Sequence, residues 1–310
     1  MVRSGVVEAV HRGSVAVAGR DGTLVAWAGD PERVTFARSS MKPLQAAVSL
    51  TLSGEDLPDD ELAVMCASHN GEPAHLRAVD ALLDRAGLSR SALRTPPGLP
   101  IDRESALAAG APEPALHNCS GKHAGMLLAC VRRGFDVATY PDPDHPLQVA
   151  VLDAVRAVAG EPTAVGVDGC GVPVHALPLR AMAATFASLA TGVGEGFGRV
   201  VESMRAEPYL VAGRDRVCTA LMQRVDDLVV KVGAEGLVCA GIPSRGLGVA
   251  VKVEDGGSRA ADPALLRSLR GLGVLDGVGD GELERFARPP VLGGGRPVGS
   301  LVAEFDLTAA

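Results

Sequence analysis

The sequence predicts a mixed α/β fold of the α+β type, in which one sheet is assembled from both chain ends and helices pack on it. Strand-like segments fill the first thirty residues and return in the C-terminal third, whereas most of the chain between them has helical character. The chain has 310 residues, 47% of them hydrophobic, which is enough to bury one large core or two intimate ones. No internal repeat or long linker divides it, so we expect a single domain over residues 1–310.

The expected strands are short runs that alternate or are wholly apolar, with turn residues such as Arg20-Asp21-Gly22 between them. They cover residues 6–10, 14–19, 23–29, 227–233, 235–242, 246–255 and 300–307, with a strand–turn–strand unit over 163–177. The expected helices carry start and stop residues, for example Pro146 at one start and Gly54 and Gly87 at two ends. They cover residues 43–54, 59–68, 72–88, 122–134, 146–160, 179–190, 196–206, 214–225 and 261–273.

Charge and hydropathy exclude several classes of function. The net charge is −7 and no basic run is present, so we expect no nucleic-acid partner. No apolar stretch approaches the ~18 residues of a membrane helix, and the N-terminal residues lack the apolar core of a signal peptide. We therefore expect a cytoplasmic protein without a membrane partner, whose six cysteines are not used as disulfides.

Lysine is scarce in this chain, which has 26 arginines and only four lysines: Lys42, Lys122, Lys231 and Lys252. Codon bias toward arginine explains how surface charge is carried, but it does not explain where lysine is retained. Because an arginine keeps its proton in a protein and a lysine can lose it, a retained lysine is a candidate base or ligand. Three of the four lie in polar, glycine- or serine-rich motifs, and Lys231 is given no role.

The first motif is Ser39-Ser40-Met41-Lys42, an S-x-x-K spacing that brings the first and last side chains to one face of a helical turn. A neutral lysine there can take the proton of Ser39 and make a nucleophile. The alternative is a serine that caps the helix and a solvated lysine. Pro43 disfavours helical geometry at Lys42, so the pair is expected at the start of the helix.

The second motif, Ser68-His69-Asn70-Gly71-Glu72, ends an apolar helix in a polar cluster. Ser68 is a second candidate nucleophile or proton relay. Helix capping, with Asn70-Gly71 as the stop, is an equally good interpretation.

The third motif is the densest polar cluster of the chain, HNCSGKHAG over residues 117–125. Cys119 and Lys122 share one face of a starting helix, whose backbone N–H groups could hold a carboxylate. A fourth motif, Asp168-Gly169-Cys170, forms a turn whose glycine lets the backbone approach a ligand. Their spacing in the sequence does not show that Cys119 and Cys170 lie in one site. Two unrelated buried thiols are an equally good interpretation of these cysteines.

Lys252 lies on the expected strand 246–255. Period-two alternation places it with Gly248 and Ala250 on the face opposite the core. Two small residues beside a lysine leave room for something to lie against that face, although a solvent-facing strand is the simpler interpretation.

Taken in order, RSSMKPLQ, CASHNGEPAH, HNCSGKHAGML and GCGVP resemble the rhizobial-type L-asparaginases, also called asparaginase II or class 3. The resemblance runs from about residue 6 to residue 307 and implies one asparaginase II-type catalytic domain. It implies a fold similar to serine β-lactamases and glutaminases, with a mostly antiparallel sheet flanked by helices. It also implies a homodimer and L-asparagine as substrate.

The resemblance further implies two serine–lysine pairs, Ser39 with Lys42 and Ser68 with Lys252, with Ser39 as the favoured nucleophile. It implies a zinc ion (Zn2+) bound by Cys119, Lys122 and Cys170, with Asp168 beside it. The residues expected to bind substrate are polar or backbone groups next to these motifs: Arg38, His69, Asn70, Asn118, Asp168 and Gly169. The expected reaction is acyl transfer, in which a neutral lysine removes the serine proton and ammonia leaves.

Two other classes of function fit parts of the sequence, and a third has no feature in its favour. A glutaminase, peptidase or β-lactam hydrolase could use the same serine–lysine pairs on another substrate. A non-catalytic zinc- or amino-acid-binding protein would not need those pairs, and no feature favours a purely structural dimer module.

Overall fold

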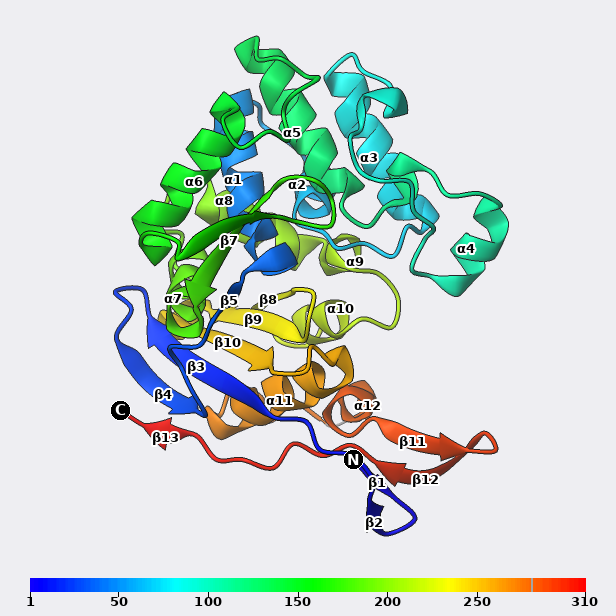
Figure 1. Cartoon of the computed structure of the whole chain (residues 1–310), viewed down its shortest axis with the longest axis vertical. Helices are drawn as coiled ribbons and strands as arrows, with labels where there is room; N and C mark the ends of the chain where they lie inside the picture. Colours follow the sequence, from blue (N-terminus) through cyan, green and yellow to red (C-terminus); the bar gives the residue numbers. More distant parts are fainter. Residues whose placement is uncertain (280) are drawn as a thin grey trace.

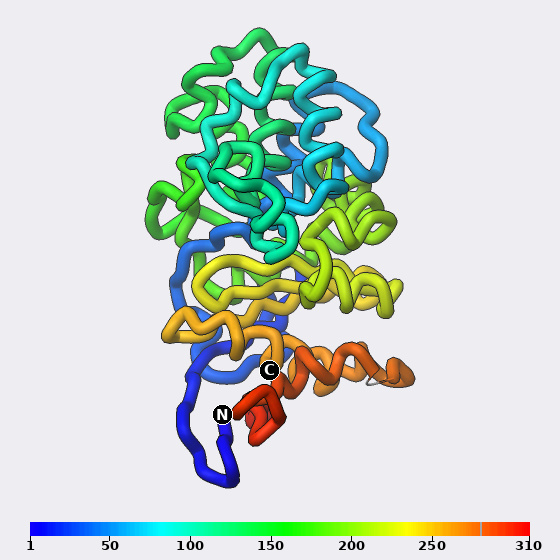
Figure 2. The backbone as a smooth tube through the Cα atoms, turned by 90° about the vertical axis from the view of Figure 1, so that its right-hand side faces the viewer, coloured from blue at the N-terminus to red at the C-terminus, as the bar shows by residue number. Residues whose placement is uncertain are grey.

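The computed structural model describes residues 1–279 and 281–310. The main sheet crosses the middle of the molecule, with a helical layer on one side of it and helices α11 (Ser258–Gly271) and α12 (Glu284–Ala287) on the other (Figure 1). Both chain ends lie on the side away from the helical layer, as two views at right angles agree (Figures 1 and 2). The site described below lies where the helical layer meets the sheet.

The main sheet has six antiparallel strands in the order β13-β4-β3-β10-β9-β8. Its strands come from both ends of the chain: β3 (Gly13–Gly19), β4 (Leu24–Ala28), β8 (Val229–Val232), β9 (Leu237–Ile242), β10 (Leu247–Val253) and β13 (Thr308–Ala309). N-terminal β3 pairs with C-terminal β10 along its whole length, so that Val15 faces Val251 and Ser14 faces Lys252. The predicted mixed fold with an antiparallel sheet built from both termini is confirmed.

The residue pattern of β10 explains how a helix reaches the sheet. Helix α7 (Leu179–Ala190) packs against β10, β3 and β9. A Cβ atom on Gly248 would lie 1.9 Å from the carbonyl oxygen of Ala183 on that helix, so only glycine allows this approach. The room that the small residues of β10 were expected to leave is therefore filled by α7.

The helical layer is formed by α1, α2, α3, α5, α6 and α8, whose mutual contacts bury their apolar faces. Helix α1 follows a short 3-10 turn, η1 (Arg38–Met41), and ends at Gly54, which takes the left-handed conformation with φ 66°. The helices, in chain order, are α1 (Lys42–Ser53), α2 (Asp59–Met65), α3 (Pro73–Arg85), α4 (Arg103–Ala109), α5 (Ser120–Arg133), α6 (Pro146–Ala159), α7 (Leu179–Ala190), α8 (Phe197–Ala206), α9 (Pro208–Val211), α10 (Val217–Met222), α11 (Ser258–Gly271) and α12 (Glu284–Ala287).

Two smaller antiparallel sheets complete the described chain. One has the order β11-β12-β1-β2, from β1 (Val2–Arg3), β2 (Val6–Val7), β11 (Pro290–Gly293) and β12 (Arg296–Ser300). The other has the order β5-β7-β6, from β5 (Val34–Phe36), β6 (Ala164–Val167) and β7 (Pro173–Pro178). The β6–β7 turn carries Asp168 and Cys170, as the strand–turn–strand prediction over 163–177 required.

The predicted strand over 300–307 is wrong, because between Ser300 at the end of β12 and Thr308 at the start of β13 the chain joins no ladder. Partly exposed and exposed residues alternate over residues 303–307, which mimics a strand in the sequence. The segment is held from α11 instead: the Arg267 guanidinium donates to the carbonyl oxygen of Phe305 at 3.0 Å. Of the strand predicted over residues 6–10, only Val6–Val7 is a strand in the structure. Its partner, β1, is itself only two residues long.

Of the helices described in the two ranges 1–279 and 281–310, none is both long and apolar enough to cross a membrane.

Candidate active site

The hydroxyl of Ser68 lies between two buried lysine amines. Its Oγ is 3.0 Å from Nζ of Lys42 and 2.8 Å from Nζ of Lys231. Lys42 is the first residue of α1, Ser68 follows the end of α2, and Lys231 is on the edge strand β8, so helical layer and sheet meet at this hydroxyl. Lys42, Ser68 and Lys231 are 1%, 4% and 0% exposed, so solvent screens a charge on either amine poorly.

The hydrogen-bond acceptors around the two amines differ. Nζ of Lys42 faces three oxygens: the carbonyls of Ala67 and Asn118 and the hydroxyl of Ser68. Three acceptors match the three N–H donors of an ammonium group. Among the residues that the structure describes, Nζ of Lys231 faces two oxygens: the carbonyl of Val232, at 2.8 Å, and the same hydroxyl. A neutral Lys231 amine would donate to that carbonyl and accept the Ser68 proton.

Burial is the main reason why the pKa of Lys231 is lowered to about 7. The positive charge of Lys42 lowers it further, and that of Arg216 acts in the same direction. The neutral amine is thus accessible near neutral pH, as a general base requires.

The structure corrects the predicted partner of Ser68. The Lys252 amine donates to the backbone carbonyls of Glu235, in the β8–β9 turn, and Val253. It does not hydrogen-bond to Ser68. Lys252 lies on β10, two strands away from β8. The missed residue is Lys231. The scarcity of lysine applied to it equally, and a lysine inside the apolar run LVVKV could have been taken as buried.

Ser39 lies in η1, next to a residue with unusual backbone geometry. Arg38 has a φ of 47°, a left-handed conformation that costs a non-glycine residue energy and is often found at functional sites. The Ser39 side chain is partly exposed and forms no hydrogen bond with another described residue, so it is open to a substrate. The Lys42 amine, predicted to face Ser39, hydrogen-bonds instead to Ser68 and the two carbonyls.

The predicted zinc ligands Cys119, Lys122 and Cys170 lie close together, next to the serine–lysine group. Nζ of Lys122, in the first turn of α5, lies 3.0 Å from Sγ of Cys170 on the β6–β7 turn. Cys119 immediately precedes α5 and hydrogen-bonds to Oδ1 of Asn118 at 3.2 Å. All three side chains are buried. Within the described ranges, no group of three or more His, Cys, Asp or Glu residues is arranged to hold a metal, so a metal here would depend on the Lys122 amine.

Charges within this cluster reinforce one another. Hydrogen bonding with Cys170 holds the pKa of the Cys119 thiol well below its usual range, against the effect of burial. Burial opposes the charge on Lys122, but the two sulfurs outweigh it and raise the pKa of the amine. Burial likewise opposes the charge on Asp168, but Lys122 and the hydrogen bond from Arg38 outweigh it and lower the pKa of the carboxyl.

The residues expected to bind substrate divide into two groups. Arg38 and Asp168 form an ion pair of 2.7 Å beside Cys170, and the backbone N–H of Gly169 donates to the same carboxylate. In contrast, His69 and Asn70 are buried. Both ring nitrogens of His69 are engaged, with the hydroxyl of Ser120 and the backbone N–H of Gly71, and burial lowers the pKa of its ring.

Asn118 connects the two clusters. Its carbonyl oxygen accepts from the Lys42 amine at 3.4 Å and from the backbone N–H of His69 at 3.2 Å. Its side chain accepts from the Cys119 thiol. The serine–lysine group and the thiol group are therefore parts of one site.

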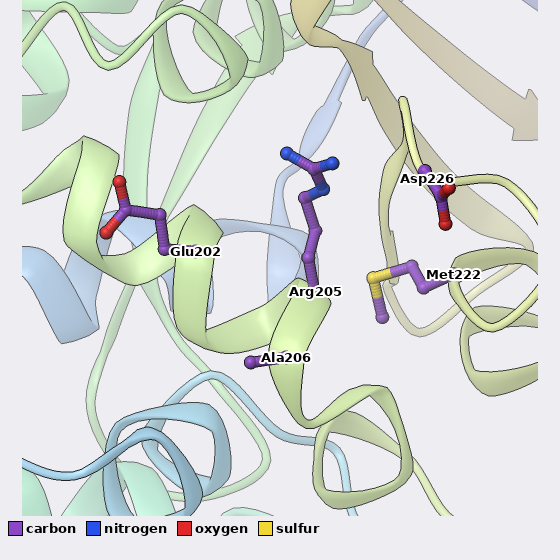
Figure 3. A pocket seen from close by; sticks show the side chains of 5 residues that line it. All are labelled: Glu202, Arg205, Ala206, Met222 and Asp226. Atoms are coloured by element: carbon purple, nitrogen blue, oxygen red, sulfur yellow. The ribbon is translucent and has the colours of Figure 1, made fainter.

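Two cavities lie elsewhere in the molecule. The cavity in Figure 3, of about 290 Å³, is lined by Glu202, Arg205 and Ala206 of α8 with Met222 and Asp226. A second, of about 630 Å³, lies between the chain termini and the outer face of the main sheet. Neither is lined by a residue of the serine–lysine or thiol clusters, so the chemistry points to the polar site and not to these cavities.

The class of protein follows from a family model described as L-asparaginase II, which matches residues 1–303. The chain belongs to the L-asparaginase II family, which makes it an amidohydrolase. No functionally curated protein matches the sequence.

Solved structures with similarity include Mglu, at 20% identity and a TM-score of 0.38, with 87% of this chain and 69% of that chain covered. Mglu in its glutamate form matches at 19% identity and a TM-score of 0.39, with 87% and 63% covered. A β-lactamase from Mycobacterium bovis matches at 17% identity and a TM-score of 0.40, with 85% and 95% covered.

Proposed function

We propose that this protein is an L-asparaginase, which hydrolyses L-asparagine to L-aspartate and ammonia by serine–lysine acyl transfer. The observation that carries the mechanism is the Ser68 hydroxyl held between the Lys42 and Lys231 amines at 3.0 and 2.8 Å. A binding protein gains nothing from two buried amines on one hydroxyl, whereas proton transfer requires such contacts. Membership of the L-asparaginase II family supports the choice of substrate.

With Lys42 charged and Lys231 neutral, the two amine contacts on Ser68 form a proton path. An N–H of the Lys42 ammonium donates to the Ser68 oxygen, and the Ser68 hydroxyl turns to donate to the neutral Lys231 amine. Moving both protons one step along this chain leaves Lys42 neutral, Ser68 unchanged and Lys231 charged. To take the Ser39 proton, the neutral Lys42 amine must then turn from Ser68 toward Ser39, which lies one helical turn earlier in the chain.

Ser39 is the proposed nucleophile because it is the partly exposed serine, whereas Ser68 is buried. Its oxygen attacks the amide carbon, the C–N bond breaks, and the leaving nitrogen takes a proton from the Lys42 ammonium as ammonia departs. Water then hydrolyses the β-aspartyl ester. Asparagine must be held at both ends, and the Arg38 guanidinium and the Asp168 carboxylate would bind its carboxylate and amino groups.

The donor set suits a zinc ion, because two thiolates and an amine match the sulfur and nitrogen ligands that zinc prefers. Cys119, Lys122 and Cys170 would hold it, and the Lys122 amine would lose a proton on binding. When bound, zinc would supply a Lewis acid that could anchor a carboxylate oxygen or a neutral amine of the substrate. The 3.0 Å contact between the Lys122 amine and the Cys170 sulfur supports this convergence.

The test is ammonia release from L-asparagine and L-glutamine, with a chromogenic β-lactam as a third substrate. One extra methylene moves the amide relative to Ser39, and a misplacement of about 1 Å can cost on the order of 100-fold in rate. We expect much faster release from asparagine. Equal turnover of both amides, or preferred turnover of the β-lactam, would contradict the assignment.

A further inference from the structure

The end of α9 at Val211 and the loop that follows it, residues 212–216, are hydrogen-bonded to the turn that carries Ser68. The backbone N–H of Ser68 donates to the carbonyl of Val211 at 3.1 Å, and that of Asn70 donates to the carbonyl of Ala212 at 2.8 Å. The loop joins α9 to α10, so it belongs to neither cluster of the site. The backbone position of Ser68 is set by this loop.

The Asn70 side chain completes the attachment. Its amide nitrogen donates to Oε1 of Glu72 at 2.8 Å and to the carbonyl of Arg214 at 2.9 Å. Its amide oxygen accepts from the Arg216 guanidinium at 2.8 Å. The reverse orientation would place oxygen against the Glu72 carboxylate and nitrogen against Arg216, so these partners fix which way the amide points.

Gly213 allows this close packing. It has a φ of 118°, and a Cβ atom there would lie 2.6 Å from the Asn70 amide nitrogen and 2.8 Å from Oε1 of Glu72. Because both N–H groups and the oxygen of the Asn70 amide are engaged inside the protein, this side chain has a structural role. The expectation that Asn70 binds substrate is not supported by these contacts.

Arg216 carries a charge that no close carboxylate neutralises. It is partly buried, and within the described part of the chain no carboxylate oxygen lies within 4.0 Å of its guanidinium. The charge of Arg216 acts on the carboxyl of Asp262, which lies on α11. Burial raises the pKa of that carboxyl to about 6, and the positive charge of Arg216 opposes this rise. An unpaired, partly buried cation acts on its neighbours with little screening.

The groups around the Lys231 amine are mostly uncharged thiols. Cys66 at the end of α2, Cys218 of α10 and Cys239 of β9 are buried, and burial raises the pKa of each. The groups that act on the Lys231 pKa are Lys42, Cys218, Arg216 and Cys119, after burial itself. Lys42 and Arg216 are the cations of this set, and Arg216 is the one that cannot lose its proton.

We propose that Arg216 is a positioning residue for the Ser68–Lys231 pair, which locks the Ser68 turn through Asn70 and holds a permanent positive charge near the Lys231 amine. That charge favours the neutral amine, so that Lys231 remains able to receive the proton passed through Ser68. The consequence for catalysis rests on the proposed function, whereas the effect on Lys231 does not.

The small number of lysines makes a direct test practical. Protein labelled with ¹³C at lysine Cε has four signals, which single Lys→Arg variants assign, and each is followed by NMR from acid to alkaline pH. We compare wild type with Arg216→Gln, Arg216→Met and Arg216→Lys. Glutamine keeps a hydrogen bond to Asn70 without the charge, methionine removes both, and lysine keeps the charge.

The matched control is Arg214→Met. Arg214 is in the same loop, but its side chain is 54% exposed and meets Glu104 at 3.5 Å, away from Asn70. We expect the Lys231 midpoint to rise by roughly 0.5–1 pH unit in Arg216→Gln and Arg216→Met. It should stay within a few tenths of a unit in Arg216→Lys and Arg214→Met. An unchanged midpoint in Arg216→Gln overturns the proposal, and should Arg216→Met not fold, the glutamine variant decides.

The second readout is the pH profile of kcat/KM for ammonia release from asparagine. Its acidic limb should move to higher pH in Arg216→Gln by the same amount as the NMR midpoint. A fall in activity with no movement of the limb would indicate a merely structural role and overturn the proposal. If the wild type released no ammonia from any amide, the proposed function would fail, while the NMR titration would still decide the role of Arg216.

Discussion

The hydroxyl of Ser68 and the amine of Lys231 are 163 residues apart in the chain and 2.8 Å apart in the structure. The contact joins the end of α2 to the edge strand β8, and it places a lysine with a pKa of about 7 against a serine. Five predictions test what this contact and its surroundings do.

Replacing Lys231 should abolish turnover. Lys231→Met removes the proton acceptor and Lys231→Arg fixes the proton in place, so both should lower kcat on the order of 10²–10⁴-fold. The matched control is Lys252→Met, which removes a buried lysine whose amine hydrogen-bonds to the backbone carbonyls of Glu235 and Val253. Near wild-type kcat in a folded Lys231→Met protein would show that this amine is not part of the proton path.

The pH dependence of activity should follow the Lys231 amine. A base works when it is deprotonated, so kcat/KM should fall about tenfold per pH unit below pH 7 and level off above it. Stopped-time ammonia assays between pH 5 and 9 measure the limb. A flat profile through pH 7 would exclude a titrating amine of this pKa from the reaction.

Lys231→Met should also stabilise the protein at low pH. The folded-state pKa of about 7 lies below the ordinary value of 10.5, so the unfolded chain binds more protons between these limits. The free energy of unfolding therefore rises with pH between about 7 and 10.5. Below pH 7 the folded protein carries the charged Lys231 amine, so the full cost of burying that charge is present there. The gain in Tm of Lys231→Met over wild type should be several degrees at pH 6 and should shrink near pH 10, as measured by circular dichroism.

Lys42→Arg should be inactive although it preserves charge, because arginine cannot release the proton that the Ser39–Lys42–Ser68 path must move. Ser39→Ala should be similarly inactive, and the double variant should lose little more, since the two residues act as one unit. The comparison is kcat for both single variants and the double, with circular dichroism as the fold control. A folded Lys42→Arg variant with wild-type kcat would assign the base role to Lys231 acting on Ser68 directly.

Metal analysis should find one zinc per chain, and the Cys119→Ser, Cys170→Ser double variant should lose it. Thiolates are the strong ligands of the set, and a serine hydroxyl binds zinc poorly at neutral pH. The fold should survive, because a chain of 310 residues does not need the metal for its core. Unchanged zinc in the double variant would rule out this site.

The sequence by itself determined the sheet built from both chain ends, since period-two and helical patterns are local and the turn residues between them are explicit. It also singled out Ser39, Lys42, Ser68, Cys119, Lys122 and Cys170 through four polar motifs and the scarcity of lysine. The strand predicted over 300–307 failed because alternation reports burial, and burial came there from packing on α11 without a ladder.

Only the tertiary structure decided which lysine meets Ser68. Lys231 and Lys252 both lie on apolar strands, and a strand pattern shows which face a side chain takes but not which distant residue lies against that face. The order β10-β9-β8 places Lys231 under the helical layer and Lys252 two strands away. Likewise, Asn70 was recognisable as polar, but its engagement by Arg214 and Arg216 depends on a loop more than 140 residues further along the chain.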